Sequence, residues 1–201
     1  ILLNALTSPV RFKELLVSPN EMKQKFIRLI NEEIKNKQAG KPAYILIKIN
    51  HITDPVMVKK LYEASSHGVR IDLLVRGNCS LITGVPGVSD TIRINGIIDR
   101  YLEHSRIFIF ANGGDEKMFI GSADWMPRNL DNRVEVIAPV YDPEIKADLK
   151  RVVEYGLKDT LQGRVVDGTG ENRPWISEDK TAFRSQEELY KYYLNENRIK
   201  D

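Results

Sequence analysis

The residues best suited to chemistry gather in two short strings in the middle of the chain, Glu103-His104-Ser105-Arg106 and Gly121-Ser122-Ala123-Asp124. An imidazole can attack a phosphorus atom or pass a proton to a leaving group, and a nearby guanidinium can neutralise the oxygens of the same anion. A glycine lets backbone N–H groups approach an anion closely, and a serine adds a hydroxyl. The two strings therefore predict a site that handles phosphate groups.

Both strings also have a structural interpretation, in which none of these residues meets a ligand. His104 would then cap a strand, and Arg106 would pair with Glu103 or Asp124. For an isolated His-x-Arg string this interpretation is favoured. The Gly-Ser turn at hairpin distance favours the phosphate site instead.

A predicted β-hairpin brings the two strings together. Arg106 to Ala111 and Lys117 to Gly121 are short apolar runs, and Asn112-Gly113-Gly114-Asp115 between them is a typical hairpin connection. A hairpin returns its second strand beside its first. We therefore expect His104 and Ser122 at the same edge of a sheet.

A βαβ unit is predicted upstream of the hairpin. Ala43 to Asn50 is an apolar run of strand length, Asp54-Pro55 begins a helix that Gly68 ends, and Val69 to Val75 is the next strand. This order implies two parallel strands. Arg76 follows the second strand directly, at the carboxyl edge where open α/β sheets bind ligands.

The remaining segments complete a single α/β domain. Ser18-Pro19-Asn20-Glu21 reads as a capping box that begins a helix running to Gly40. Arg133 to Val140 is a further strand, Pro143 to Leu157 is an amphipathic helix, and Gln186 to Asn195 is a last helix after an irregular tail. We expect a mixed sheet flanked by helices.

Two residues near the predicted sheet edge and one beside the Gly-Ser turn leave their roles open. Lys48 and Asn50 end the first strand and could face the site, although a surface position suits Lys48 equally well. Trp125 could stack on a base, but a tryptophan is more often a core anchor.

Composition excludes several classes of function. The 201 residues carry 30 Lys+Arg against 28 Asp+Glu, and a net charge of +2 argues against bulk nucleic-acid binding. No apolar run reaches the roughly 18 residues of a membrane span. Cys79 is the single cysteine, and no Cys/His cluster has metal-ligand spacing. We expect a cytoplasmic protein, free or peripheral at a membrane, with no metal site among its own residues.

The start of the chain indicates a piece of a longer protein. The first residue is isoleucine, and residues 1–6 lack the basic start and long apolar run of a secretory signal. We expect residues 1–14 to be a linker from an upstream domain and residues 15–201 to form the domain described above.

The two strings resemble the motif of the phospholipase-D-like superfamily, which reads H-x-K-x-x-x-x-D followed by Gly-Ser-x-Asn. His104 and the Gly-Ser pair match, whereas Arg106 replaces the lysine and Asp124 replaces the asparagine. The acidic position of the motif falls on Ala111. The group that orients the histidine in that superfamily is therefore missing, which argues against a self-sufficient phosphodiesterase.

Longer strings resemble the polyphosphate kinase family, bacterial enzymes that make inorganic polyphosphate from ATP. The resemblance runs from about Phe12 into the last predicted helix. The strings that carry it are Leu74-Val75-Arg76-Gly77-Asn78-Cys79-Ser80-Leu81, Arg100-Tyr101-Leu102-Glu103-His104-Ser105-Arg106, Asn112-Gly113-Gly114 and Gly121-Ser122-Ala123-Asp124-Trp125-Met126-Pro127-Arg128-Asn129-Leu130-Asp131.

The resemblance implies that this chain is the last of four domains, the last two of which are both phospholipase-D-like. The histidine that is phosphorylated, and the arginines that help to hold Mg²⁺, belong to the preceding domain. In this chain the resemblance assigns nucleotide binding to Arg76, and catalysis together with nucleotide binding to His104. Further residues are expected along a phosphate channel, namely Arg106, Ser122, Asp124 and Arg133.

The implied reaction is the reversible transfer of the terminal phosphate of ATP to polyphosphate through a phosphohistidine. The partners are then ATP or ADP with Mg²⁺, polyphosphate, the upstream domains and further copies of the enzyme, without nucleic acid or a membrane span. This chain alone is expected to be inactive. Two alternatives stay open: a non-catalytic phosphate-binding or assembly module, and a homodimeric phosphodiesterase built from two copies of His104.

Overall fold

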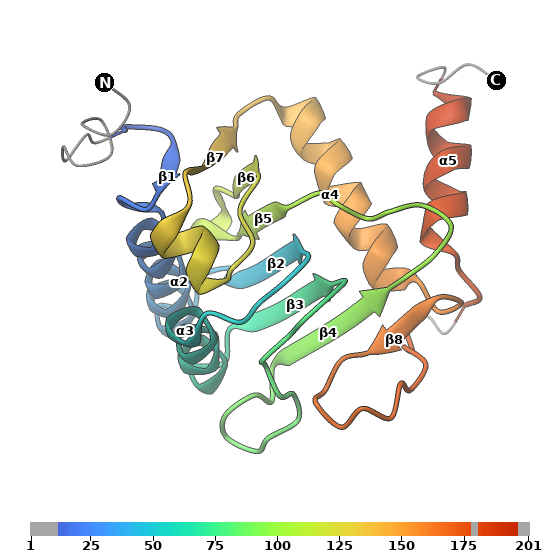
Figure 1. The fold of residues 1–201 in the computed structure, drawn as a ribbon, viewed down its shortest axis with the longest axis horizontal. Helices are drawn as coiled ribbons and strands as arrows, with labels where there is room; N and C mark the ends of the chain where they lie inside the picture. Colours follow the sequence, from blue (N-terminus) through green and yellow to red (C-terminus); the bar gives the residue numbers. More distant parts are fainter. Residues whose placement is uncertain (1–11, 178–180, 197–201) are drawn as a thin grey trace.

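Residues 12–177 and 181–196 are described by a computed structural model, and they form one open mixed sheet of eight strands in the order β1-β7-β6-β5-β2-β3-β4-β8 (Figure 1). The expected α/β architecture is confirmed. The strands are β1 (Leu16–Ser18), β2 (Tyr44–Ile49), β3 (Arg70–Val75), β4 (Ile92–Ile97), β5 (Ile107–Phe110), β6 (Lys117–Gly121), β7 (Glu135–Val140) and β8 (Gly163–Val165).

The centre of the sheet is parallel and its two flanks are antiparallel. β2, β3 and β4 run in one direction, as the predicted βαβ unit requires. β5 lies antiparallel to β2 and pairs with β6 in the predicted hairpin, so that Lys48, Ile107 and Ile120 lie side by side. The carboxyl ends of β2, β3 and β6 therefore share one edge with the start of β5.

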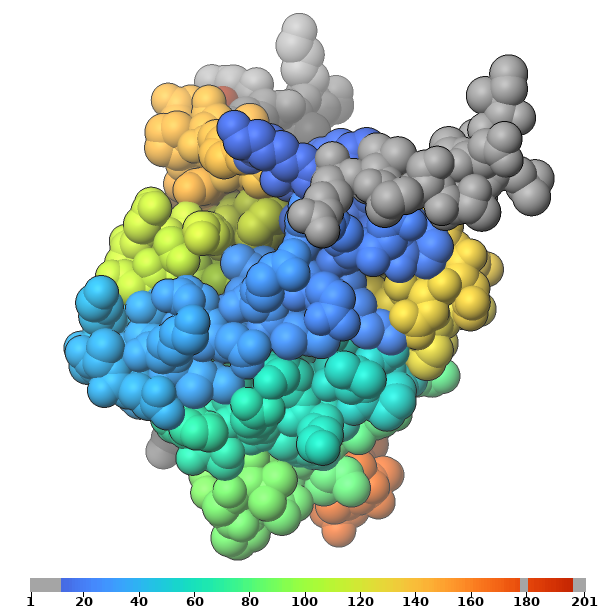
Figure 2. Space-filling view, turned by 90° about the vertical axis from the view of Figure 1, so that its left-hand side faces the viewer, coloured from blue at the N-terminus to red at the C-terminus, as the bar shows by residue number. Residues whose placement is uncertain are grey.

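Four helices among the described residues cover the sheet: α2 (Met22–Gln38), α3 (Pro55–Ser66), α4 (Pro143–Lys158) and α5 (Ser185–Asn195). Ile47 and Phe108 pack with α2 and α3 in the larger apolar layer. Leu46 and Ile109 point to the other face and pack with Val153 of α4. Figure 2 shows α2 and α3, coloured blue and teal, side by side, and α5 lies beside α4 (Figure 1).

Two helices begin as their sequences predict. The Asp54 carboxylate accepts hydrogen bonds from the Val56 and Met57 N–H groups, each at 3.0 Å, with a proline at the first turn of α3. Asp142 caps α4 in the same manner. Such a cap contributes about 1 kcal/mol because it satisfies N–H groups that have no partner within the helix.

The predicted capping box at Ser18 is wrong. Ser18 is the last residue of β1, and α2 begins later, at Met22, without a side-chain cap. The Ser18 hydroxyl lies 2.7 Å from the Asn129 carbonyl oxygen and 2.6 Å from the Arg133 carbonyl oxygen. These distant partners take the hydroxyl that the local pattern assigned to the helix.

Three strands were not predicted, namely β1, β4 and β8. β4 reads Ile-Arg-Ile-Asn-Gly-Ile, and its alternation buries Ile92, Ile94 and Ile97. β8 lies in the segment expected to be an irregular tail, and its three residues are too few for a periodic signal. The parallel part of the sheet is therefore one strand wider than the sequence analysis predicted.

The sequence also predicted an N-terminal linker and no membrane-spanning segment. Most of the expected linker, residues 1–14, lies outside the described residues. Within 12–177 and 181–196, no helix is long and apolar enough to cross a membrane.

Candidate functional site

Arg76 and His104 meet at the sheet edge formed by the carboxyl ends of β2 and β3. Arg76 Nε donates to Asn50 Oδ1 at 3.0 Å, and its Nη2 lies 3.3 Å from His104 Nδ1. A guanidinium can only donate, so Nδ1 is the acceptor and Nε2 carries the proton of the neutral ring. His104 is exposed and Arg76 is half-buried. The pair therefore presents a fixed N–H donor and a guanidinium to the solvent.

Asn50 anchors this pair from the end of β2. It is 1% exposed, its Oδ1 is occupied by Arg76, and its backbone N–H donates to Asp124 Oδ1 at 3.0 Å. Its Nδ2 has no hydrogen-bond partner in the part of the chain that the structure describes. The Asn50 side chain is therefore an orienting group for Arg76.

A mostly buried ion pair, Arg106 with Asp124, contacts the backbone of Asn50. Arg106 Nε and Nη2 donate to Asp124 Oδ1 and Oδ2 at 3.2 and 3.1 Å, and His51 N–H donates to Oδ1 at 3.3 Å. Burial alone would raise the pKa of the Asp124 carboxyl, but the Arg106 guanidinium and the backbone N–H groups outweigh it and hold the pKa below its usual value. Asp124 is therefore an ionised group that ties the end of β2 to the start of β5.

The third guanidinium nitrogen of Arg106 contacts the backbone of His104. Its Nη1 donates to the His104 carbonyl oxygen at 2.9 Å, while its other two nitrogens remain on Asp124. The structural interpretation of the sequence predicted that Arg106 pairs with Glu103 or Asp124, and the pair with Asp124 is present. Glu103 contacts neither Arg106 nor Asp124 and pairs with Lys48 at 2.7 Å. A channel role for Arg106 and Asp124 stays a prediction.

Ser122 and Arg133 contact a different part of the edge. The Ser122 hydroxyl bonds the Glu135 carboxylate and lies 3.3 Å from the Val136 N–H group, both in β7. Arg133 is exposed, and its carbonyl oxygen is a partner of Ser18. Among the described residues, neither side chain makes a hydrogen bond or an ion pair with Arg76 or His104.

Two glycines at this edge have packing reasons. A Cβ on Gly77 would lie 2.4 Å from His51 Cε1, because the turn after Arg76 presses on that ring. A Cβ on Gly121 would lie 2.4 Å from the Val136 carbonyl oxygen. Gly121 is therefore required by its neighbour in the sheet, and access of its backbone to an anion stays a prediction.

The structure decides the open roles of Lys48 and Trp125. Lys48 is 6% exposed and paired with Glu103, so it is neither a snorkelling surface group nor a free cation facing the site. Trp125 is fully buried, with ring centroids 5.1 Å from Phe26 and 5.8 Å from Phe108. It is a core anchor and has no face free for a base.

The residues at this edge suit an anion and do not fit Mg²⁺. Hard divalent cations need several carboxylate or carbonyl oxygens, but Asp124 is occupied by Arg106 and Glu103 by Lys48. Within the described residues, no group of three His, Cys, Asp or Glu side chains could hold a metal. The available donors are guanidinium and imidazole N–H groups, which bind phosphate oxygens.

A groove of about 650 Å³ lies at the opposite end of the same strands, where Asn112, Lys117 and Tyr141 are among its lining residues. Phe110, at the end of β5, pairs with Ile45, at the start of β2, so this groove is separated from Arg76 by the length of the sheet. It shares no residue with the candidate site.

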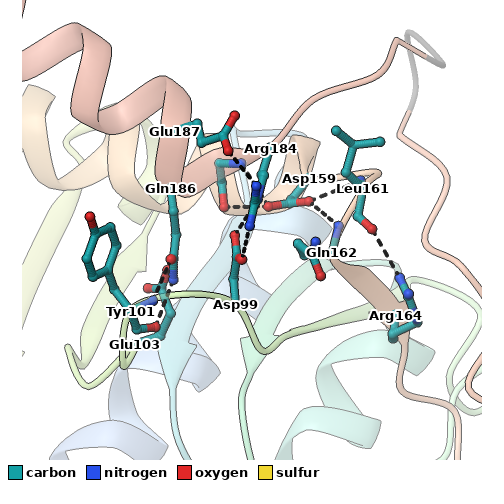
Figure 3. Close-up of polar contacts among 11 residues, drawn as sticks. Asp99, Tyr101, Glu103, Asp159, Leu161, Gln162, Arg164, Arg184, Gln186 and Glu187 are labelled. Carbon is teal, nitrogen blue, oxygen red and sulfur yellow. Dashed lines mark hydrogen bonds and ion pairs between the residues drawn. The ribbon is translucent and has the colours of Figure 1, made fainter.

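Sequence reasoning missed the residues at the start of α5 that hold the loop carrying His104. Gln186 contacts Tyr101 and Glu103, and Arg184 contacts Asp99 (Figure 3). The only sequence signal was the predicted helix start, which carries no information about its partners far along the chain.

The fold is that of phospholipase-D-like proteins. A phospholipase D family member from Salmonella typhimurium is 15% identical and superposes with a TM-score of 0.54 over 77% of this chain and 97% of its own, which shows a shared fold. Residues 15–186 match the family described as polyphosphate kinase C-terminal domain 2. The chain belongs to the polyphosphate kinase family.

Two relatives show how much of such a protein is present. The polyphosphate kinase of Vibrio vulnificus is 43% identical over 187 residues, which cover 93% of this chain and 27% of the relative. The crystal structure of the polyphosphate kinase from Porphyromonas gingivalis has a TM-score of 0.90 and 40% identity over 98% of this chain and 30% of its own. This chain thus spans less than a third of the length of these relatives.

Proposed function

We propose that this chain supplies the nucleotide- and phosphate-binding half of an active site that transfers the terminal phosphate of ATP reversibly to inorganic polyphosphate. The observation that carries the proposal is the Arg76–His104 pair at the carboxyl edge of the sheet, with Nη2 3.3 Å from Nδ1. Membership of the polyphosphate kinase family supports the same substrates.

Both substrates are polyanions, so the main task of the site is to neutralise charge and align phosphates. Arg76 binds an oxygen of the nucleotide phosphates with its outward N–H groups. His104 donates its Nε2 proton in a hydrogen bond to the phosphoryl group in transit. The bond between Arg76 and Nδ1 keeps the ring in the tautomer that this donation requires.

The contacts of His104 favour a donor over a nucleophile. A guanidinium at Nδ1 opposes the positive charge that the ring would gain by attacking phosphorus through Nε2. This agrees with the family resemblance, which implies that the phosphohistidine forms on the preceding domain. The bond from the γ-phosphorus to the bridging oxygen breaks there, ADP departs, and the phosphoryl group passes from the histidine nitrogen to the end of the polyphosphate chain.

Several finer expectations belong to this proposal. Mg²⁺ arrives with the nucleotide and takes its protein ligands from the preceding domain, as the family resemblance implies. The upstream domains complete the active site, the enzyme is a homo-oligomer, and it works in the cytoplasm, free or peripheral at a membrane.

The homodimeric phosphodiesterase is the weaker alternative. Such an enzyme needs a carboxylate to orient its nucleophilic histidine, and Ala111 stands at the motif's acidic position. In this structure Ala111 is 1% exposed, at the far end of β5, and Nδ1 of His104 faces Arg76 instead. These contacts disfavour attack by His104.

The test is His104→Gln in a full-length polyphosphate kinase that carries this chain as its C-terminal part. Turnover should fall by about 10²-fold, the usual scale for losing a group that acts on the proton or charge of the transition state. The melting temperature should stay close to the parent, because the exposed ring has little packing to lose. A lowered melting temperature with parental turnover would remove His104 from the chemistry.

A further inference from the structure

The loop that carries His104 is held by the start of α5. Residues 98–106 have no regular secondary structure, and they connect β4 to β5. Gln186 lies 85 residues after Tyr101 in the sequence, yet the two residues are in direct contact (Figure 3). The position of the loop is therefore decided by a remote segment.

Gln186 binds both backbone polar groups of Tyr101. Its Oε1 accepts from the Tyr101 N–H at 2.8 Å, and its Nε2 donates to the Tyr101 carbonyl oxygen at 2.9 Å. Nε2 also donates to Glu103 Oε1 at 2.9 Å. Because only a carboxamide combines an acceptor with two donors in this geometry, no other side chain of this length can make all three bonds.

Glu103, the residue before His104, is bonded through both of its carboxylate oxygens. Its Oε1 accepts from Gln186, and its Oε2 pairs with Lys48 Nζ of β2 at 2.7 Å. Both Lys48 and Gln186 are less than a tenth exposed. The backbone that leads into His104 is thus fixed between the sheet and α5.

Arg184 holds the other end of the loop. Its Nε and Nη2 donate to Asp99 Oδ2 and Oδ1 at 2.9 and 2.6 Å. The start of α5 is itself fastened to the end of α4, since buried Asp159 accepts from the Ser185 N–H at 2.8 Å and its hydroxyl at 2.6 Å. The loop is therefore tied, through α5, to a helix that packs on the sheet.

The imidazole itself has few contacts of its own. His104 is exposed, and among the described residues its ring makes one hydrogen bond, with Arg76. Its place is set through its backbone, by the bonds to Tyr101 and Glu103 before it and by the Arg106 contact with its carbonyl oxygen. Loosening those bonds would displace the ring without opening the apolar core.

We propose that Gln186 and Arg184 are positioning residues for catalysis, which act by holding the 99–103 segment so that His104 meets the phosphoryl group in transit. This inference rests on the proposed function of His104. It adds a requirement that the family resemblance did not supply, namely that the first turn of α5 determines turnover although it touches no substrate.

The experiment uses the full-length enzyme with Gln186→Leu, His104→Gln and both together. Gln186→Leu should lower kcat by about tenfold, as expected for a catalytic group displaced by a fraction of an ångström, while KM for ATP changes by less than about threefold. In the His104→Gln background the same change should have almost no further effect, because the group that it positions is gone. Gln162→Leu is the matched control and should behave as the parent, because among the described residues Gln162 bonds Asp159 through its backbone N–H alone and its side-chain amide makes no hydrogen bond (Figure 3).

The outcomes separate this inference from the proposed function. Parental turnover in His104→Gln overturns the proposed function itself. A loss in His104→Gln with parental turnover in Gln186→Leu overturns the positioning role alone, and so does an equal loss from Gln186→Leu in both backgrounds. Should Gln186→Leu lower the melting temperature clearly, Arg184→Lys decides: the charge remains while the fork to Asp99 is lost, so kcat should fall about threefold, and an unchanged kcat overturns the role.

Discussion

Arg76 and His104 meet at one edge of the sheet, but the contacts that hold them differ in kind. Arg76 directly follows β3, and its partner Asn50 directly follows β2, so the position of Arg76 follows from the pairing of two parallel strands. His104 lies on an irregular loop and is held by residues of α5 through Tyr101 and Glu103. The first residue is placed by the core, and the second by a remote contact.

This difference predicts different failures. Damage beneath Arg76 removes buried charge pairs of the sheet edge and should appear mainly as lost stability. Damage to the contacts of the His104 loop leaves the apolar core intact and should appear mainly as lost turnover. The following variants test that division, beginning with the largest expected effect.

Asp124→Ala should be the most damaging change. It leaves Arg106 with a mostly buried, unpaired guanidinium and removes the acceptor for two backbone N–H groups at the end of β2. We expect the free energy of unfolding to fall by about 3–5 kcal/mol, measured on the transition of this domain in the full-length protein. Asp131→Ala is the control, since it removes a half-exposed carboxylate from Lys23, which keeps its second partner Asp54, and should cost less than about 1 kcal/mol. Equal losses in the two variants would contradict the structural role of Asp124.

Arg76 variants test the nucleotide contact. Arg76→Ala should raise KM for ATP by about 10- to 100-fold, the equivalent of a charge-assisted hydrogen bond of about 1.5–3 kcal/mol. Arg76→Lys should recover only part of this loss, because lysine cannot bond Asn50, His104 and a phosphate oxygen in one plane. Steady-state kinetics at limiting ATP measure the effect. Full activity in Arg76→Lys would show that charge alone suffices at this position.

The smallest expected effect is on how the stability of the fold depends on pH in the acid range. Arg184 hydrogen bonds are the main cause that lowers the pKa of Asp99 below its usual value. The unfolded state therefore binds more protons near pH 4, so the pair stabilises the fold above about pH 4 and loses this contribution as the pH falls through the lowered pKa. Asp99→Asn should lower the melting temperature at pH 7 and approach the parent at pH 3.

Asp115→Asn serves as the comparison for that titration, because Asp115 is exposed and its carboxylate makes no ion pair among the described residues. Its melting temperature should differ from the parent by the same small amount at both pH values. If the difference in melting temperature between Asp99→Asn and the parent also stays constant with pH, the Asp99–Arg184 pair does not contribute to the loss of stability in acid.

Local patterns predicted the elements whose signals lie within a few residues. The helix starts at Asp54-Pro55 and Pro143, the Asn-Gly-Gly connection of the hairpin and the strand–helix–strand order are all present in the structure. The capping box at Ser18 failed because its hydroxyl bonds residues more than a hundred positions away. β4 was overlooked although its isoleucines alternate, and β8 offered only three residues.

The sequence by itself determined the class of fold, the family and the residue types suited to phosphate, because periodicity, caps and motif strings are properties of neighbouring residues. Tertiary structure decided which of those residues meet. Arg76 contacts His104, Arg106 forms an ion pair with Asp124, and Gln186 hydrogen-bonds Tyr101 in the His104 loop from 85 residues away. The reason is that hydrogen bonds and ion pairs form between groups close in space, and a sequence shows spacing along the chain but not the folding of the chain back on itself.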